Sequence, residues 1–171
     1  KKTKQMWFDK LRENNINLHT LIGNHTTYFK NTSEVNTLNL ILDSYDNVVV
    51  YEKPSVVEFD GVPIQFIPWI NSENYDESME ALKTSPAQIV MGHLESAGFE
   101  MYKGFASIDG DFKKELFSRF DTVFSGHFHH KSDDGQIFYL GTPYEITWND
   151  WNDPRGFHVF DTETRELERI I

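Results

Sequence analysis

Apolar and polar residues follow one another along the chain with the periods of short strands and helices. Strands are expected at short apolar, β-branched runs between turn residues, and helices where apolar residues recur every three or four positions. The expected strands cover residues 17–22, 47–51, 55–59, 62–68, 87–91, 121–125, 136–140, 156–160 and 166–170. The expected helices cover residues 2–14, 34–45, 72–84 and 111–119, with loops at 23–33 and 94–110. This order favours an α/β fold, a layered β-sandwich with mixed sheets flanked by helices.

Turn and cap residues sharpen two of these boundaries. Asp60-Gly61 between two expected strands predicts a tight hairpin turn. Ser72 is the expected N-cap of the helix at 72–84, and Pro86 follows the end of that helix.

The composition predicts one folded domain over residues 1–171. Of the 171 residues, 39% are hydrophobic and 15% are aromatic, which is too apolar for a disordered chain. No apolar run approaches the roughly 20 residues that cross a bilayer, so no membrane association is expected. Cys is absent, which excludes disulfides and thiolate metal sites and makes a reducing cytoplasm the default location.

The net charge of −11 argues against a protein that binds a nucleic-acid backbone over a wide surface. It is compatible with an enzyme that meets phosphate groups through bound cations, because such ions are often the largest local charges in a site.

Three of the expected strands run through Gly into His. The segments are Thr20–His25, Ile89–His93 and Val123–His127, and the last continues as Phe128-His129-His130. Parallel strands place ligand groups just beyond their carboxyl ends, and a Gly there is expected to let the chain turn sharply. The pattern therefore predicts one polynuclear metal site and a metal-dependent hydrolase.

The side chains in these segments suit nitrogen and oxygen coordination. Asn24 offers a neutral oxygen, and the adjacent His25 is placed to act as an acid or to stabilise charge, although a plain loop Asn with a solvated His remains the alternative. His127 and His129 point to the same side of an extended segment and can serve one ion or two neighbouring ions. This ligand set suits Mn, Mg, Fe or Zn.

The remaining histidines have a different expected role. His19 and His158 lie inside expected strands and are predicted to pack or to face solvent. His130 extends the cluster to His-x-His-His, but the His-x-His-x-Asp-His pattern of metallo-β-lactamases is not followed, because its Asp-His pair is missing.

In this order, Gly23-Asn24-His25, Gly92-His93 and Gly126–His129 resemble the motifs of calcineurin-like metallophosphoesterases. Further stretches are similar to the SbcD-type DNA-repair nuclease branch, and closest to the subunits of phage recombination endonucleases. These stretches are Ile67-Pro68-Trp69, Tyr102-Lys103-Gly104, Gly141-Thr142-Pro143, Asp153–Phe157 and Asp161–Thr164.

The resemblance implies a role for each matching residue. Asn24, His93 and His127 would hold the second of two divalent ions, for which Mn(II) is the first choice, and His129 would reach the first ion. His25 would not coordinate either metal ion and would assist at the scissile phosphate.

The chain departs from the family pattern in two places. The family's Asp-x-His and Gly-Asp-x-x-Asp ligands do not precede Asn24, so residues 1–171 are expected to form a nuclease domain that lacks its N-terminal strands. Thr26 stands where the family usually has Asp, which predicts weaker support for His25.

Substrate contacts are expected from the loops after the ligands. Lys103 and Lys131 could meet a backbone phosphate, with a solvated surface role as the alternative. Aromatic residues there could stack on unpaired bases, pack in the core or form a dimer contact. They are Tyr102, Phe105, Tyr144, Trp148 and Trp151. Arg155 is expected to stabilise the turn before the last strands.

The function implied by the resemblance is metal-dependent hydrolysis of DNA by the nuclease subunit of an ATPase–nuclease recombination or repair complex. Its implied partners are DNA, an SMC-like ATPase and a second copy of the chain, in the host cytoplasm if the protein is encoded by a phage. Two alternatives remain open. One is a general phosphodiesterase or phosphatase of the same superfamily, and the other is a non-catalytic docking subunit with a partial metal site.

Overall fold

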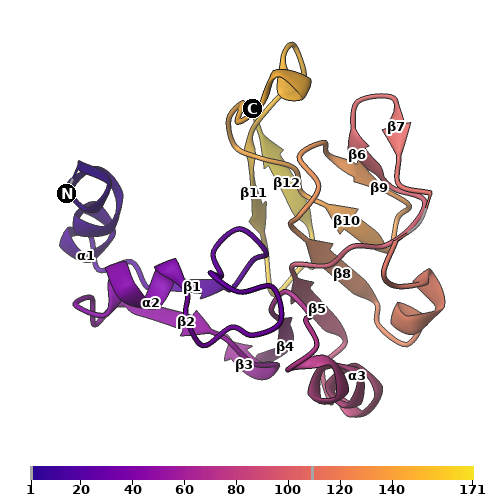
Figure 1. Cartoon of the computed structure of the whole chain (residues 1–171), viewed down its shortest axis with the longest axis horizontal. Coiled ribbons are helices and arrows are strands. Elements are labelled where there is room, and N and C mark those ends of the chain that lie inside the picture. The colour runs from indigo at the N-terminus through magenta and orange to yellow at the C-terminus, as the bar shows by residue number, and fades with distance from the viewer. Residues whose placement is uncertain (1, 109) are drawn as a thin grey trace.

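A six-stranded mixed sheet lies at the centre of the computed structural model, which describes residues 2–108 and 110–171 (Figure 1). Its strand order is β3-β4-β5-β8-β10-β9. The strands are β3 (Ser55–Phe59), β4 (Val62–Ile67), β5 (Ile89–Gly92), β8 (Thr122–Ser125), β10 (Ile137–Tyr139) and β9 (Ser132–Asp133). β4, β5, β8 and β10 run parallel, and β3 and β9 pair antiparallel at the two edges. The predicted mixed α/β class is confirmed.

Side-chain alternation gives the sheet two apolar faces. Ile67, Val90 and Val123 face one cluster, which also contains Leu82 of α3 (Tyr75–Thr84) and Phe117 of the 3-10 helix η2 (Lys114–Phe117). Ile64, Ile89 and Phe124 face a second cluster on the opposite side. Since successive residues of a strand point to opposite faces, the mostly apolar sequences of β4, β5 and β8 predict burial on both sides.

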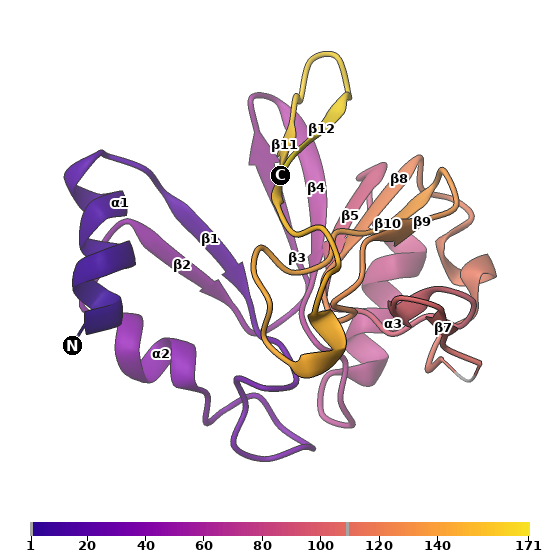
Figure 2. The same cartoon turned by 90° about the horizontal axis from the view of Figure 1, so that it is seen from above.

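Two small sheets pack against the second face. One pairs β1 (Leu18–Leu21) with β2 (Val48–Tyr51) in parallel, and the other pairs β11 (Phe157–Phe160) with β12 (Leu167–Ile170) antiparallel. Leu21, Tyr51, Phe160 and Leu167 contact the second cluster. Figure 2 shows β1 and β2 together with α1 (Asp9–Glu13) and α2 (Thr37–Leu42) away from α3. His19 lies in β1, stacked on Tyr51, as predicted for a packing residue.

Most expected elements are present, with shifted ends. The helix expected at 2–14 consists of the π-helical turn η1 (Lys4–Phe8) followed by α1, and α2 begins after Asn36, whose Oδ1 accepts the N–H of Asn39 at 2.9 Å. The hairpin at Asp60-Gly61 is confirmed, with φ angles of 50° and 81° that both central residues of such a turn require.

Other expectations were wrong. Ser72 is not the N-cap of α3, because Asn74 takes that position; its Oδ1 accepts the N–H of Asn71, and this local side-chain bond competes with helix formation. The region 94–110 was expected as a loop but contains a hairpin of β6 (Glu100–Tyr102) and β7 (Phe105–Ala106). The strand β9 and the 3-10 helix η3 (Trp148–Asp150) were also not predicted.

No helix in the described part of the chain is long and apolar enough to cross a membrane.

Candidate metal centre

Three strand ends converge at one edge of the fold. β5 and β8 are parallel neighbours in which Gly92 pairs with Ser125, and the N–H of Gly126 donates to the carbonyl of Gly92 at 3.0 Å. The end of β1 joins them through the N–H of Trp69, which follows β4 and donates to the carbonyl of Ile22 at 2.8 Å. Asn24, His93 and His127 therefore meet although they are far apart in the sequence, as the rule for parallel strand ends predicts.

Polar atoms of these three residues lie in direct contact. His93 Nε2 lies 2.9 Å from Asn24 Oδ1 and 3.3 Å from His127 Nδ1, and the two imidazole rings meet edge to face with centroids 5.1 Å apart. Two ring nitrogens and one amide oxygen thus converge on one point. Together they form a ligand set that suits a divalent cation. We call Asn24, His93 and His127 the convergent set. Within residues 2–108 and 110–171, no group of three or more His, Cys, Asp or Glu side chains is placed to hold a metal ion, so the third ligand of this set has to be Asn24.

The glycines of the motifs make room for the His93 ring. A Cβ added to Gly23 would lie 3.0 Å from His93 Cε1, and one added to Gly126 would lie 3.3 Å from His93 Nδ1. Tight turns begin at two of these glycines, since the carbonyl of Gly23 accepts the N–H of Thr26 at 3.0 Å and the carbonyl of Gly126 accepts the N–H of Phe128 at 3.1 Å. The left-handed backbone conformation at this edge belongs to His127, with φ 77°. Such a conformation costs on the order of 1–3 kcal/mol and persists only where the surrounding structure imposes it.

Burial keeps the two histidines neutral. The pKa of His93 is lowered from 6.5 to about 4, mainly by burial and also by the nearby charges of His127 and His25. The pKa of His127 is also lowered, mainly by burial and against the opposing effect of Glu95. Neutral imidazoles keep the lone pairs that a metal ion requires, so the electrostatics favour coordination at neutral pH.

Glu95 orients His127, a role that was not predicted from the sequence. Its Oε2 lies 3.1 Å from His127 Nε2, on the side of the ring opposite to His93. A carboxylate there selects the tautomer with the proton on Nε2 and leaves the Nδ1 lone pair directed at the convergent set. The only signal in the sequence is that Glu95 follows His93 by two residues, which places both on one side of an extended segment.

Buried hydroxyl groups hold the segment that carries Glu95. Ser125 Oγ accepts the N–H of Leu94 at 3.0 Å, and Tyr139 Oη accepts the N–H of Ser96 at 2.8 Å while donating to the carbonyl of Leu94 at 3.2 Å. Since Ser125 and Tyr139 end β8 and β10, the sheet itself fixes the position of Glu95.

His25 lies near the two buried histidines but is exposed. Its charge lowers the pKa of both His93 and His127, which places it within electrostatic reach of them. The hydroxyl of Thr26 accepts the N–H of Gly23 at 3.0 Å and donates to its carbonyl at 2.8 Å. Thr26 therefore closes the turn that presents His25.

His129 is held by a buried carboxylate. Its Nδ1 lies 3.2 Å from both oxygens of Asp150, which is fully buried and also accepts the N–H groups of Ile146 and Thr147 at 2.9 and 2.7 Å. Burial alone would raise the pKa of Asp150, but these backbone bonds and His129 lower it. Asp150 was not predicted from the sequence. The hydrogen-bond partner of the His129 ring is Asp150 and not Asn24 or His93, but a cavity of about 250 Å³ is lined by both His127 and His129.

Arg155 stabilises the last turn as predicted. Its guanidinium donates to Asp150 at 3.3 Å, to Asp153 at 2.8 Å and to the carbonyl of His129. His130 contacts Asp153 at 2.7 Å and Glu100 at 3.4 Å, so its ring nitrogens are engaged outside the convergent set.

The predicted substrate contacts fall in different settings. Lys103 is exposed in the turn between β6 and β7, whereas Lys131 forms an ion pair with Asp133. Several aromatic side chains of these loops are largely exposed, which excludes core packing for them. They are Phe105, Tyr144, Trp148 and Trp151.

Comparison with known proteins finds one close similarity. The chain is 46% identical over 157 residues to exonuclease subunit 1 of Enterobacteria phage T4. The alignment covers 91% of this chain and 45% of the relative, so the chain spans less than half of the length of the protein that it matches. No protein-family model matches the chain. The expected similarity to a phage nuclease subunit is confirmed, and the placement among SbcD-type metallophosphoesterases stays a prediction.

Proposed function

We propose that this chain carries the metal centre of a nuclease that hydrolyses phosphodiester bonds of DNA. The observation that carries the proposal is the convergence of Asn24 Oδ1, His93 Nε2 and His127 Nδ1, with successive separations of 2.9 and 3.3 Å. The name of the similar phage protein, an exonuclease subunit, supports the same chemistry.

The convergent residues would hold one divalent ion, and His129 would contribute to a second. Mn(II) is the first choice for a site of neutral nitrogen and oxygen ligands, with Mg, Fe and Zn as alternatives. When bound, such ions polarise a phosphoryl oxygen and lower the pKa of water. Glu95 and Asp150 would keep His127 and His129 in the orientation that coordination requires.

His25 would act directly on the substrate. It is exposed and close to His93 and His127, so it can reach a phosphate oxygen that lies at the metal centre without being a ligand itself. There its imidazole would donate a hydrogen bond to the phosphate or a proton to the leaving oxygen.

The proposed partners follow from the similarity and the charge. A protein similar to a named subunit is expected to act in a complex, and we propose an SMC-like ATPase and a second copy of the chain as its members. The net charge of −11 makes a broad electrostatic grip on DNA unfavourable, so partners and bound cations would supply the affinity for the backbone.

The test combines calorimetry with Mn(II) and a nuclease assay on labelled DNA. His93→Ala should abolish metal binding and activity together, whereas His25→Ala should abolish activity and leave metal binding close to that of the wild type. His158→Ala, in β11, is the matched control and should change neither quantity. Loss of metal binding in His25→Ala would contradict the role given to His25, and full activity of His93→Ala would refute the proposal.

A further inference from the structure

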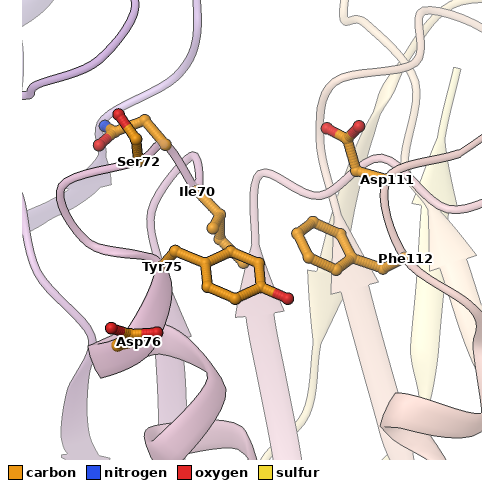
Figure 3. Close-up of a pocket in the computed structure, with 7 residues that line it drawn as sticks. Ile70, Ser72, Tyr75, Asp76, Asp111 and Phe112 are labelled. Carbon is orange, nitrogen blue, oxygen red and sulfur yellow. The ribbon is translucent and has the colours of Figure 1, made fainter.

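A second cavity lies beside the candidate metal centre. Its volume is about 530 Å³, within the range of ligand-binding clefts. One wall comes from the segment between β4 and α3 and from the first turn of α3, and the other wall comes from Asp111 and Phe112 before η2 (Figure 3).

Both walls are continuous with the segments that build the metal centre. The N–H of Phe112 donates to the carbonyl of Glu95 at 3.1 Å, and the side chain of Glu95 contacts His127. An isolated parallel bridge also pairs Ser96 with Phe112, which holds this wall beside the segment that carries Glu95. On the other wall, Ile70 follows Trp69, whose N–H is bonded to the end of β1. A ligand in this cavity would therefore lie next to a group bound at the metal centre.

The lining of the cavity suits a flat, uncharged ring. Figure 3 shows the rings of Tyr75 and Phe112 on opposite sides, with Ile70 next to Tyr75. Tyr75 is 49% exposed and Ile70 is 8% exposed, so the cavity has an accessible aromatic edge and a buried apolar floor. Aromatic faces of this kind stack on nucleobases regardless of sequence.

The polar groups of the lining exclude a phosphate and favour a hydrogen-bond donor. Among the described lining residues, Asp76 and Asp111 carry negative charge and none is Lys or Arg. Carboxylates repel a phosphate at this position but accept hydrogen bonds from the amino groups of bases, as they do from cytosine N4.

We propose that this cavity binds an unpaired nucleobase of the strand whose phosphodiester lies at the metal centre. The inference rests on the proposed nuclease function and adds a specificity site to it. The base stacks on the ring of Tyr75 beside Phe112, and its amino group donates to the carboxylate of Asp111. Bases with an amino group, which are cytosine, adenine and guanine, are therefore preferred over thymine.

The experiment measures binding in the presence of a chelator, so that its result does not depend on metal or on cleavage. DNA duplexes carry a short single-stranded end with 2-aminopurine, at either the 3′ or the 5′ terminus, and are mixed with the whole protein. A fluorescence change on binding should occur for at least one terminus. Tyr75→Ala should remove this change and weaken binding about 5- to 150-fold, as expected for the loss of one stacking contact.

Matched variants separate stacking from general damage. Tyr75→Phe keeps the ring and should bind like the wild type, and Tyr28→Ala removes a 79% exposed tyrosine outside the cavity and should have no effect. Asp111→Asn should reduce the preference for cytosine over thymine while keeping the fluorescence change. Equal binding by Tyr75→Ala and Tyr28→Ala, or no fluorescence change with the wild type, would overturn the proposal.

The two proposals fail in different ways. A normal fluorescence response without Mn(II)-dependent cleavage would remove the nuclease function and leave the base site standing. Cleavage that is unaffected by Tyr75→Ala, together with unaltered 2-aminopurine fluorescence, would remove the base site alone.

Discussion

Replacement of Glu95 tests whether the carboxylate positions a metal ligand. In Glu95→Ala, His127 loses the contact of 3.1 Å that fixes its tautomer, while the convergent atoms of Asn24 and His93 remain. Loss of such an orienting carboxylate typically weakens metal binding about 10- to 100-fold, which corresponds to about 1.4–2.8 kcal/mol. Stability should change little, because the side chain of Glu95 is 33% exposed. Calorimetric titration with Mn(II) and thermal unfolding of the metal-free protein measure the two effects separately.

Glu100 provides a matched control for this experiment. It also contacts a histidine, His130 at 3.4 Å, and its side chain is 41% exposed, but that histidine lies outside the convergent set. Glu100→Ala should therefore leave the Mn(II) affinity unchanged, and Glu95→Gln, which retains a hydrogen-bond acceptor, should fall between Glu95→Ala and the wild type. Equal Mn(II) affinity of Glu95→Ala and Glu100→Ala, or a loss of affinity in Glu95→Ala that comes only from unfolding, would contradict the orienting role of Glu95.

Three further predictions concern neighbouring features. Gly23→Ala should weaken Mn(II) binding several-fold in calorimetry, because its Cβ would lie 3.0 Å from the His93 ring and displace it; unchanged affinity would contradict the packing role of Gly23. Asp150→Asn should lower the free energy of unfolding in urea by about 3 kcal/mol, because it removes the charge of a fully buried carboxylate that pairs with Arg155, whereas the exposed Asp133→Asn should cost little. The metal-free protein should lose up to about 3 kcal/mol of stability as the pH falls from 6.5 to 4, since unfolded His93 binds a proton in this window and folded His93, with a pKa of about 4, does not. A flat stability profile over this pH range would contradict the burial of a neutral His93, and His93→Gln should flatten the profile.

The central strands were predictable because their sequence pattern and their environment agree. β4, β5 and β8 are short and mostly apolar, and each lies within two residues of its expected bounds. The hairpin of β6 and β7 left no such signal, because its strands have three and two residues. Part of the support for β6 comes from a distant segment, since the carbonyl of Met101 accepts the N–H groups of His129 and His130. A pairing of this kind depends on the tertiary structure and has no local period.

The proposed metal ligands could be predicted from the sequence, but the residues that orient these ligands could not. The strand-end rule identified Asn24, His93 and His127, which the structure brings into contact. Glu95 and Asp150 were missed because neither ends a strand, and their roles depend on where loops fold back. The packing role of Gly23 was also not predicted, because the His93 ring, which occupies the space that a Cβ would need, is 70 positions further along the chain.

The negative charge around the metal centre determines the order in which metal ions and DNA are expected to bind. Glu95 contacts His127 directly and Asp111 lies within electrostatic reach of it, so the metal-free centre presents carboxylates rather than cations to an incoming phosphate. A phosphodiester gains attraction there only after divalent ions have reversed the local charge. It follows from the proposal that Mn(II) binds before the scissile phosphate, whereas the uncharged base enters its cavity without metal. Affinity for the terminal base should therefore persist in a chelator, and affinity for the backbone should rise with Mn(II).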